Sequence, residues 1–160
     1  MALDPKFIGR TYGPFTYEIG REKSREFSLI LGGSVPSAGT FGAPPAHVSP
    51  LLYDEGAAKA GPYGDLIAFP SFAVVFAIRP FSAAIADPEL GVDRVRLVHG
   101  EQELEFLGAL RMGDVLTTTG HISELYRKAG MDFLVVTTES RNAYGDPMVR
   151  GVWTAVIRPA

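Results

Sequence analysis

The chain contains no cysteine among its 160 residues, and it has only three histidines, His47, His99 and His121. Without cysteine there are no disulfide bonds, thiolate nucleophiles or cysteine-ligated metals, and this absence suits a cytoplasmic protein. Three scattered histidines alone make a poor metal site. We therefore expect no metal ion and no other bound cofactor.

Long apolar runs and strong charge are also missing. The longest uncharged apolar run, Phe69 to Ile78, is too short to span a bilayer. The N-terminal residues have no apolar core flanked by basic residues, so we expect no signal peptide. The net charge is −3 without a long basic run, which gives nucleic-acid binding no electrostatic support. We expect a cytoplasmic protein that binds neither membranes nor nucleic acids.

The composition is otherwise that of a soluble globular protein. Hydrophobic residues make up 46% of the chain and charged residues 21%, both close to the average for such proteins. A chain of this length can bury a sizeable core within one domain. We therefore expect a single domain over residues 1–160.

The N-terminal part of the sequence predicts helices separated by a loop. Apolar residues at helical spacing predict a helix from Tyr17 to Leu31, ended by Gly32-Gly33. Residues 34–50 are rich in Pro, Gly, Ser and Ala, which predicts a loop. The alanines of residues 51–60 favour a short helix.

A buried helix is predicted over residues 70–86, because the segment is apolar nearly all round and rich in alanine. Pro70 suits its first turn, whereas Pro80 should kink or split it. Strand patterns follow over residues 95–106, 115–126, 131–142 and 148–157. The apolar parity flips across Gly100, which predicts a β-bulge there. The residues alone thus predict an α+β protein, with a helix packed on one antiparallel sheet.

Four segments resemble the MaoC-like dehydratases, namely residues 27–38 (FSLILGGSVPSA), 54–76, 98–116 and 142–158. The most specific of them is the third, VHGEQELEFLGALRMGDVL. The chain is most similar to the N-terminal MaoC-like domains, also called FAS1-like dehydratase domains. These include the non-catalytic subunits of heterodimeric 3-hydroxyacyl-thioester dehydratases. The resemblance implies a hot-dog fold, in which an antiparallel sheet wraps around a long central helix.

The resemblance also implies that the family's catalytic pair is missing. MaoC-type hydratases carry Gly-Asp-x-Asn-Pro-x-His, but here Gly33 stands at the aspartate position and Ala38 at the histidine position. In the family a backbone N–H near the central helix holds the thioester oxygen. The matching position is Pro70, which has no N–H, although the N–H of Ser71 is a possible replacement.

Two histidines are weak substitutes for the lost pair. His47 lies in the predicted loop, where a solvated histidine is the alternative interpretation. His99 lies beside the predicted bulge, where a structural role is the alternative. His121 falls in a run of threonines and is expected at the surface. The glutamates that alternate after the bulge are expected to form a solvated face, namely Glu101, Glu103 and Glu105.

The candidate substrate-binding residues are Phe69, Ser71, Phe72, Phe76, His99 and Gln102. The phenylalanines are either plain core or the lining of an acyl tunnel, because such tunnels are mostly apolar. Gln102 alternates with Leu104 and Phe106, on the face opposite the glutamates. It matches a family glutamine, which implies hydrogen bonds to a loop or to the thioester.

Three functions remain open at this stage. The first is a subunit of an (R)-3-hydroxyacyl-thioester dehydratase or enoyl-CoA hydratase, which shapes the acyl tunnel while a partner supplies the Asp/His pair. The second is a homodimeric acyl-thioester binding protein without chemistry, and the third is a hot-dog acyl-CoA thioesterase. The expected ligand is an acyl-CoA or acyl-carrier-protein thioester. The expected assembly is a homodimer, or a heterodimer with a catalytic MaoC-like hydratase, joined edge to edge.

Overall fold

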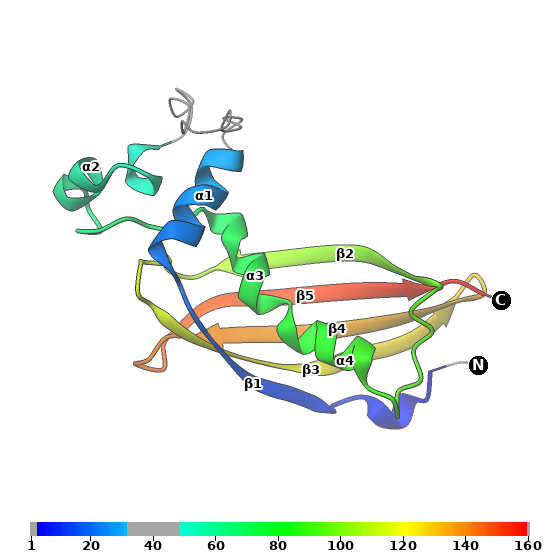
Figure 1. Ribbon diagram of the computed structural model, residues 1–160. Helices are drawn as coiled ribbons and strands as arrows, with labels where there is room; N and C mark the ends of the chain where they lie inside the picture. Colours follow the sequence, from blue (N-terminus) through cyan, green and yellow to red (C-terminus); the bar gives the residue numbers. More distant parts are fainter. Residues whose placement is uncertain (1–2, 32–48, 160) are drawn as a thin grey trace.

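The computed structural model describes residues 3–31 and 49–159. Its centre is a five-stranded antiparallel sheet in the order β1-β3-β4-β5-β2 (Figure 1). The strands are β1 (Thr11–Glu18), β2 (Leu97–Phe106), β3 (Val115–Lys128), β4 (Met131–Arg141) and β5 (Pro147–Ile157). The strands predicted after the central helix are therefore confirmed, with small shifts at their ends.

The helices are α1 (Arg21–Leu31), α2 (Glu55–Ala60), α3 (Val74–Ala77) and α4 (Arg79–Ala86), and 3-10 turns cover Pro5–Phe7, Pro50–Leu52 and Pro70–Ala73. In Figure 1, α3 and α4 cross one face of the sheet, while α1 and α2 gather beyond the end where β2 finishes. None of the helices in the described ranges is long and apolar enough to cross a membrane.

The predicted helix from Tyr17 to Leu31 is wrong in its first part, because Tyr17 belongs to β1 and the helix begins at Arg21. The residues of β1 are mostly aromatic or threonine, which favour strands. The alternation is hidden in the sequence because the pairing register shifts between Tyr12 and Phe15. Gly13 and Pro14 lie at this irregularity and break the period of two that would have identified the strand.

The central helix is split, as the sequence predicts. The 3-10 turn Pro70–Ala73 leads into α3, and α4 begins after Ile78, one residue before Pro80. Pro80 is buried and lies close to the sheet, because a Cβ added at Gly120 of β3 would lie 2.7 Å from the Pro80 Cβ. The close approach of helix to sheet therefore requires glycine at position 120.

The predicted bulge in β2 is confirmed, since its pairing with β5 shifts between His99 and Glu101. Before the bulge His99 lies opposite Ala155, and after it Gln102 lies opposite the buried Trp153. Gly100 is therefore the extra residue. The helix-facing positions of β2 are Leu97, His99, Gln102, Leu104 and Phe106.

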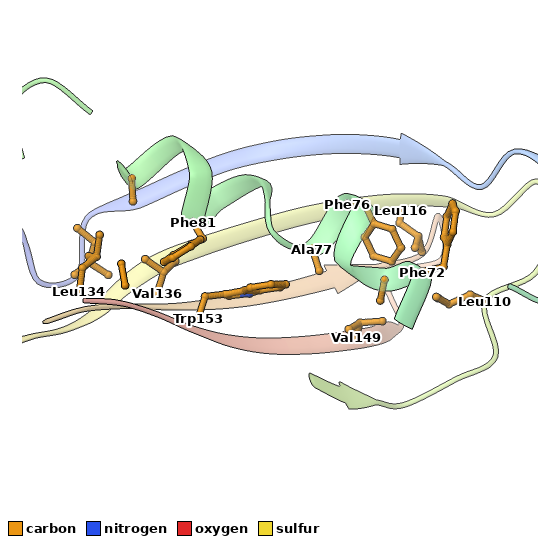
Figure 2. Close-up of a cluster of buried hydrophobic side chains, with 14 of the residues drawn as sticks. Phe72, Phe76, Ala77, Phe81, Leu110, Leu116, Leu134, Val136, Val149 and Trp153 are labelled. Atoms are coloured by element: carbon orange, nitrogen blue, oxygen red, sulfur yellow. The ribbon is translucent and has the colours of Figure 1, made fainter. Parts of the chain in front are cut away.

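The core fills the space between the split helix and the sheet. Figure 2 shows Phe72 and Phe76 near Leu116 at one end, and Phe81 near Trp153 at the other. Each large side chain buried in this way contributes roughly 1.5–3 kcal/mol to folding. The indole N–H of Trp153 donates to the Thr138 hydroxyl at 2.9 Å, so its polar group is satisfied.

Candidate functional site

Backbone hydrogen bonds fix the entrance to the central helix. The N–H of Ala68 donates to the Leu110 carbonyl at 2.8 Å, and the N–H of Met112 donates to the Leu66 carbonyl at 3.2 Å. The segment before the helix therefore runs beside residues 110–112. This pairing places Phe69 and Pro70 next to the segment that follows β2.

An ion pair holds the same entrance from the side of α1. The Arg21 guanidinium donates to both carboxylate oxygens of Asp65, at 3.1 and 2.9 Å, and it lies 3.4 Å from Glu55 of α2. The hydrogen bond from Arg21 lowers the pKa of Asp65, and the Leu66 N–H lowers it further. One arginine thus joins the start of α1, the start of α2 and the chain that leads into the central helix.

A cleft of about 360 Å³ opens at this entrance. Its lining is Tyr63, Ile67, Ala68, Pro70, Phe106, Leu107, Gly108, Ala109 and Leu110. Apolar walls of this kind are typical of ligand sites. Pro70 occupies the first position of the helix and has no N–H. Ser71 is the second residue, so its N–H has no carbonyl within the helix to bond and remains a candidate donor.

The candidate phenylalanines lie mainly in the core. Phe72 and Phe76 are 0% exposed. The Phe72 ring centre lies 5.3 Å from that of Phe27 and 6.2 Å from that of Tyr17, whereas Phe76 stacks on Tyr17 at 5.8 Å. Phe69 is half-buried at the start of the helix. In the single chain these rings stabilise the fold, and their role as a tunnel lining stays a prediction.

His99 and Gln102 lie on the helix-facing side of β2, and both are exposed. The His99 ring centre lies 5.5 Å from that of Phe81 and 6.1 Å from that of Trp153, beside α4. At about 3.3 Å per residue along a strand, His99 is roughly 20 Å from Phe106, which lines the cleft. A single chain therefore places His99 and the Ser71 N–H at opposite ends of the central helix. The hydrogen-bonding role of Gln102 stays a prediction.

The remaining candidates are placed as follows. His121 is exposed on β3, and the glutamates of β2 are exposed, as the sequence predicts. Arg150 of β5 lies 3.2 Å from both Glu105 and Glu139. Gly33, Ala38 and His47 lie outside the described residues. Within the described ranges, no three His, Asp or Glu side chains gather in a way that suits a metal ion.

A second cleft, of about 430 Å³, was not anticipated from the sequence, and it lies among residues at the start of β2 and the end of β5. Its lining includes Arg96, Arg127 and Arg158. Arg96 pairs with Asp93 at 2.6 Å and Arg127 with Asp132 at 3.8 Å, so two of the charges are offset. Because these arginines come from segments far apart in the chain, no sequence motif marks them.

Comparison with known proteins relates this arrangement to a family. Residues 6–150 match the family described as FAS1-like, dehydratase domain region. A UPF0336 protein of Saccharopolyspora erythraea is 40% identical over 159 residues, which cover 99% of this chain and 93% of that protein.

Two solved structures resemble nearly the whole chain. One is the C-terminally truncated HadBC (3R-hydroxyacyl-ACP dehydratase) complex of Mycobacterium tuberculosis, with a TM-score of 0.73 and 22% identity over 94% of this chain and 96% of that chain. The other is the ChsH1–ChsH2 complex of the same organism, with a TM-score of 0.64 and 12% identity over 94% of this chain and 98% of that chain. These likenesses confirm the hot-dog fold, although its central helix is shorter and more broken than the resemblance implied.

Proposed function

The chain belongs to the FAS1-like dehydratase domain family, and we propose that it is a non-catalytic subunit of an (R)-3-hydroxyacyl-thioester dehydratase or enoyl-CoA hydratase. One observation carries the proposal. The family scaffold is kept, but the groups suited to proton transfer and to thioester binding lie at opposite ends of the central helix.

The chemistry explains why this separation matters. Dehydration of a 3-hydroxyacyl thioester removes an α-proton and protonates the departing hydroxyl, which requires a carboxylate and an imidazole within reach of the substrate. An N–H must also hold the thioester oxygen as negative charge develops on it. None of the described residues that line the entrance cleft carries a carboxylate or an imidazole. By the resemblance to MaoC-type hydratases, Gly33 and Ala38 stand at the family's catalytic positions.

Pairing with a second hot dog would complete the site. When two sheets join edge to edge through antiparallel β2 strands, the start of one β2 lies opposite the end of the other. His99 and Gln102 of this chain then approach the helix entrance of the partner, where the partner's Asp/His pair acts on the acyl-CoA or acyl-carrier-protein thioester. Both solved relatives above are described as complexes of two differently named components, which supports a two-subunit assembly.

The apolar cleft also favours a second candidate function, which is acyl-thioester binding without chemistry. In that case the chain would bind acyl-CoA as a homodimer and would turn over nothing with any partner. The described part of the cleft offers no carboxylate to a thioesterase, so nothing in it favours that third function.

The test is hydration of crotonyl-CoA and a longer enoyl-CoA, followed as loss of absorbance. We expect the purified chain alone to be inactive. A hydratase from the same organism that carries Gly-Asp-x-Asn-Pro-x-His should gain activity when mixed with it, and the His99→Ala variant should reduce that gain. Turnover by the chain alone at ordinary enzyme rates, on the order of 1–1,000 per second, would contradict the proposal. Binding of butyryl-CoA without turnover in any mixture would favour the second candidate.

A further inference from the structure

The open edge of the sheet carries side chains of one charge. After the bulge at Gly100, the outward-facing residues of β2 are Glu101, Glu103 and Glu105, and all three are exposed. The charge of Glu105 is neutralised by the Arg150 guanidinium, which lies 3.2 Å from its carboxylate. Glu101 and Glu103 form no ion pair within the part of the chain that the structure describes. We call these three residues the glutamate ladder.

The glutamate ladder conflicts with pairing to a second copy of this chain. In an antiparallel pair, side chains directly opposite one another lie on the same face of the sheet. If two copies pair symmetrically about Glu103, then Glu103 lies opposite itself and Glu101 lies opposite Glu105. A shift of two residues in either direction still places Glu103 opposite another glutamate. Like charges directly opposite one another destabilise a strand pair, so every such register weakens the homodimer.

The same edge is otherwise well suited to pairing. β2 contains no proline, so every residue keeps its backbone donor and acceptor. At its end Phe106 is 43% exposed and Leu107 is 41% exposed, which offers apolar area for an interface. An edge with intact backbone groups and an adjoining apolar patch favours a partner strand, and its charge decides which one.

We infer that the glutamate ladder selects a different hot-dog subunit over a second copy of this chain. The partner's facing edge strand should present lysine, arginine or uncharged side chains on its outer face, because opposite charges across strands stabilise the pair. The ladder is then a device against homodimers. This inference rests on the proposed function only in naming the partner as the catalytic subunit.

The test measures self-association of the full chain by sedimentation equilibrium. The Glu101→Gln/Glu103→Gln variant should self-associate about tenfold more tightly than the wild type, because the opposed charges are removed. Glu124→Gln is the matched control, since Glu124 is an exposed glutamate on β3, away from this edge, and its removal should change nothing. Labelled wild type titrated with Glu103→Lys should also associate more tightly than wild type with itself.

Salt provides a second readout that needs no variant. Raising the ionic strength screens exposed charges, so self-association of the wild type should strengthen. Equal dissociation constants for the wild type and the neutralised variant, or a tight wild-type dimer that salt leaves unchanged, would overturn the inference. These results do not depend on catalysis. Tighter self-association of the neutralised variant, with no activity in any mixture, would support the ladder and contradict the proposed function.

Discussion

β1 and β2 are the two edges of one sheet, but they differ in how open they are to another strand. Pro14 lies within β1 and lacks an N–H, and the register shift between Tyr12 and Phe15 makes that edge irregular. Both features discourage strand addition. β2 has no proline over Leu97–Phe106, and its outer face carries the glutamate ladder. One edge is therefore closed by its backbone, whereas the other is left open and is selective through charge.

The central helix also covers the two edges of the sheet unequally. Its two parts pack over β1, β3 and β4 and also contact β5, and the Tyr12 hydroxyl of β1 donates to Asp87, just after α4, at 2.8 Å. Arg10 lies 3.1 Å from the same carboxylate. On the other side, His99 and Gln102 of β2 remain exposed although they face the helix layer. Within the described residues, the core is therefore covered more completely on the β1 side than on the β2 side.

The largest expected difference is between two alanine variants, one of a phenylalanine packed near β1 and one of a phenylalanine at the end of β2. Phe76→Ala should lower the free energy of unfolding by about 3–5 kcal/mol, because Phe76 is 0% exposed and its removal leaves a cavity. Phe106→Ala should cost less than about 1 kcal/mol in the isolated chain, since Phe106 is already 43% exposed and its truncation opens no sealed cavity. Urea denaturation of both variants measures the difference. Equal losses of unfolding free energy in the two variants would contradict the difference between the β1 side and the β2 side of the sheet.

A smaller effect tests how closely α4 packs against the sheet at Gly120 of β3. Gly120→Ala should lower the free energy of unfolding by about 1–3 kcal/mol, because the new methyl group would lie within 3 Å of Pro80, Thr137 and Thr138. Gly20→Ala is the control, since nothing lies within 4 Å of its Cβ position. Denaturation midpoints that shift equally for both variants would show that the helix is packed less tightly than the structure indicates.

The smallest expected effect concerns the contact between β1 and the helix end. Tyr12→Phe removes the hydrogen bond to Asp87 and should cost about 1 kcal/mol in urea denaturation at neutral pH. Tyr144→Phe makes the same change at a tyrosine that is 91% exposed, so it serves as the control and should leave stability unchanged.

The same contact has a pH dependence. Burial raises the pKa of Tyr12 to about 12, and the hydrogen bond to Asp87 adds to the rise. The pKa of an unfolded tyrosine is about 10. Because folding raises this pKa, the contribution of Tyr12 to stability is complete below pH ~10 and is lost as the pH rises toward 12. Burial opposes ionisation of Asp87, but the hydrogen bond from Tyr12 keeps its pKa below the ordinary value, so its contribution is lost only in acid. In Tyr12→Phe, the alkaline loss from this group should be absent.

The sequence predicted those parts of the fold that have a local signal. The flip of apolar parity at Gly100 marked the bulge, and proline at position 80 marked the split helix. β1 was missed because Gly13 and Pro14 interrupt its alternation, so local spacing alone did not identify it.

The candidate site was only partly predictable for a different reason. His99 and Ser71 were both chosen for their chemistry, but their separation depends on where β2 lies against the helix. The Arg21–Asp65 ion pair joins residues 44 positions apart, and no short motif signals it. Pairing across such distances follows from tertiary packing rather than from residue spacing.

The most direct test of the account is hydrogen–deuterium exchange on the chain with and without the motif-bearing hydratase from the same organism. Those backbone amides of Glu101–Phe106 that point away from β5 should gain protection in the mixture, because a partner strand would accept their hydrogen bonds, while the amides of β1 should stay unchanged. Protection that appears along β1 and not along β2 would contradict the claim that β2 is the edge at which a catalytic partner binds.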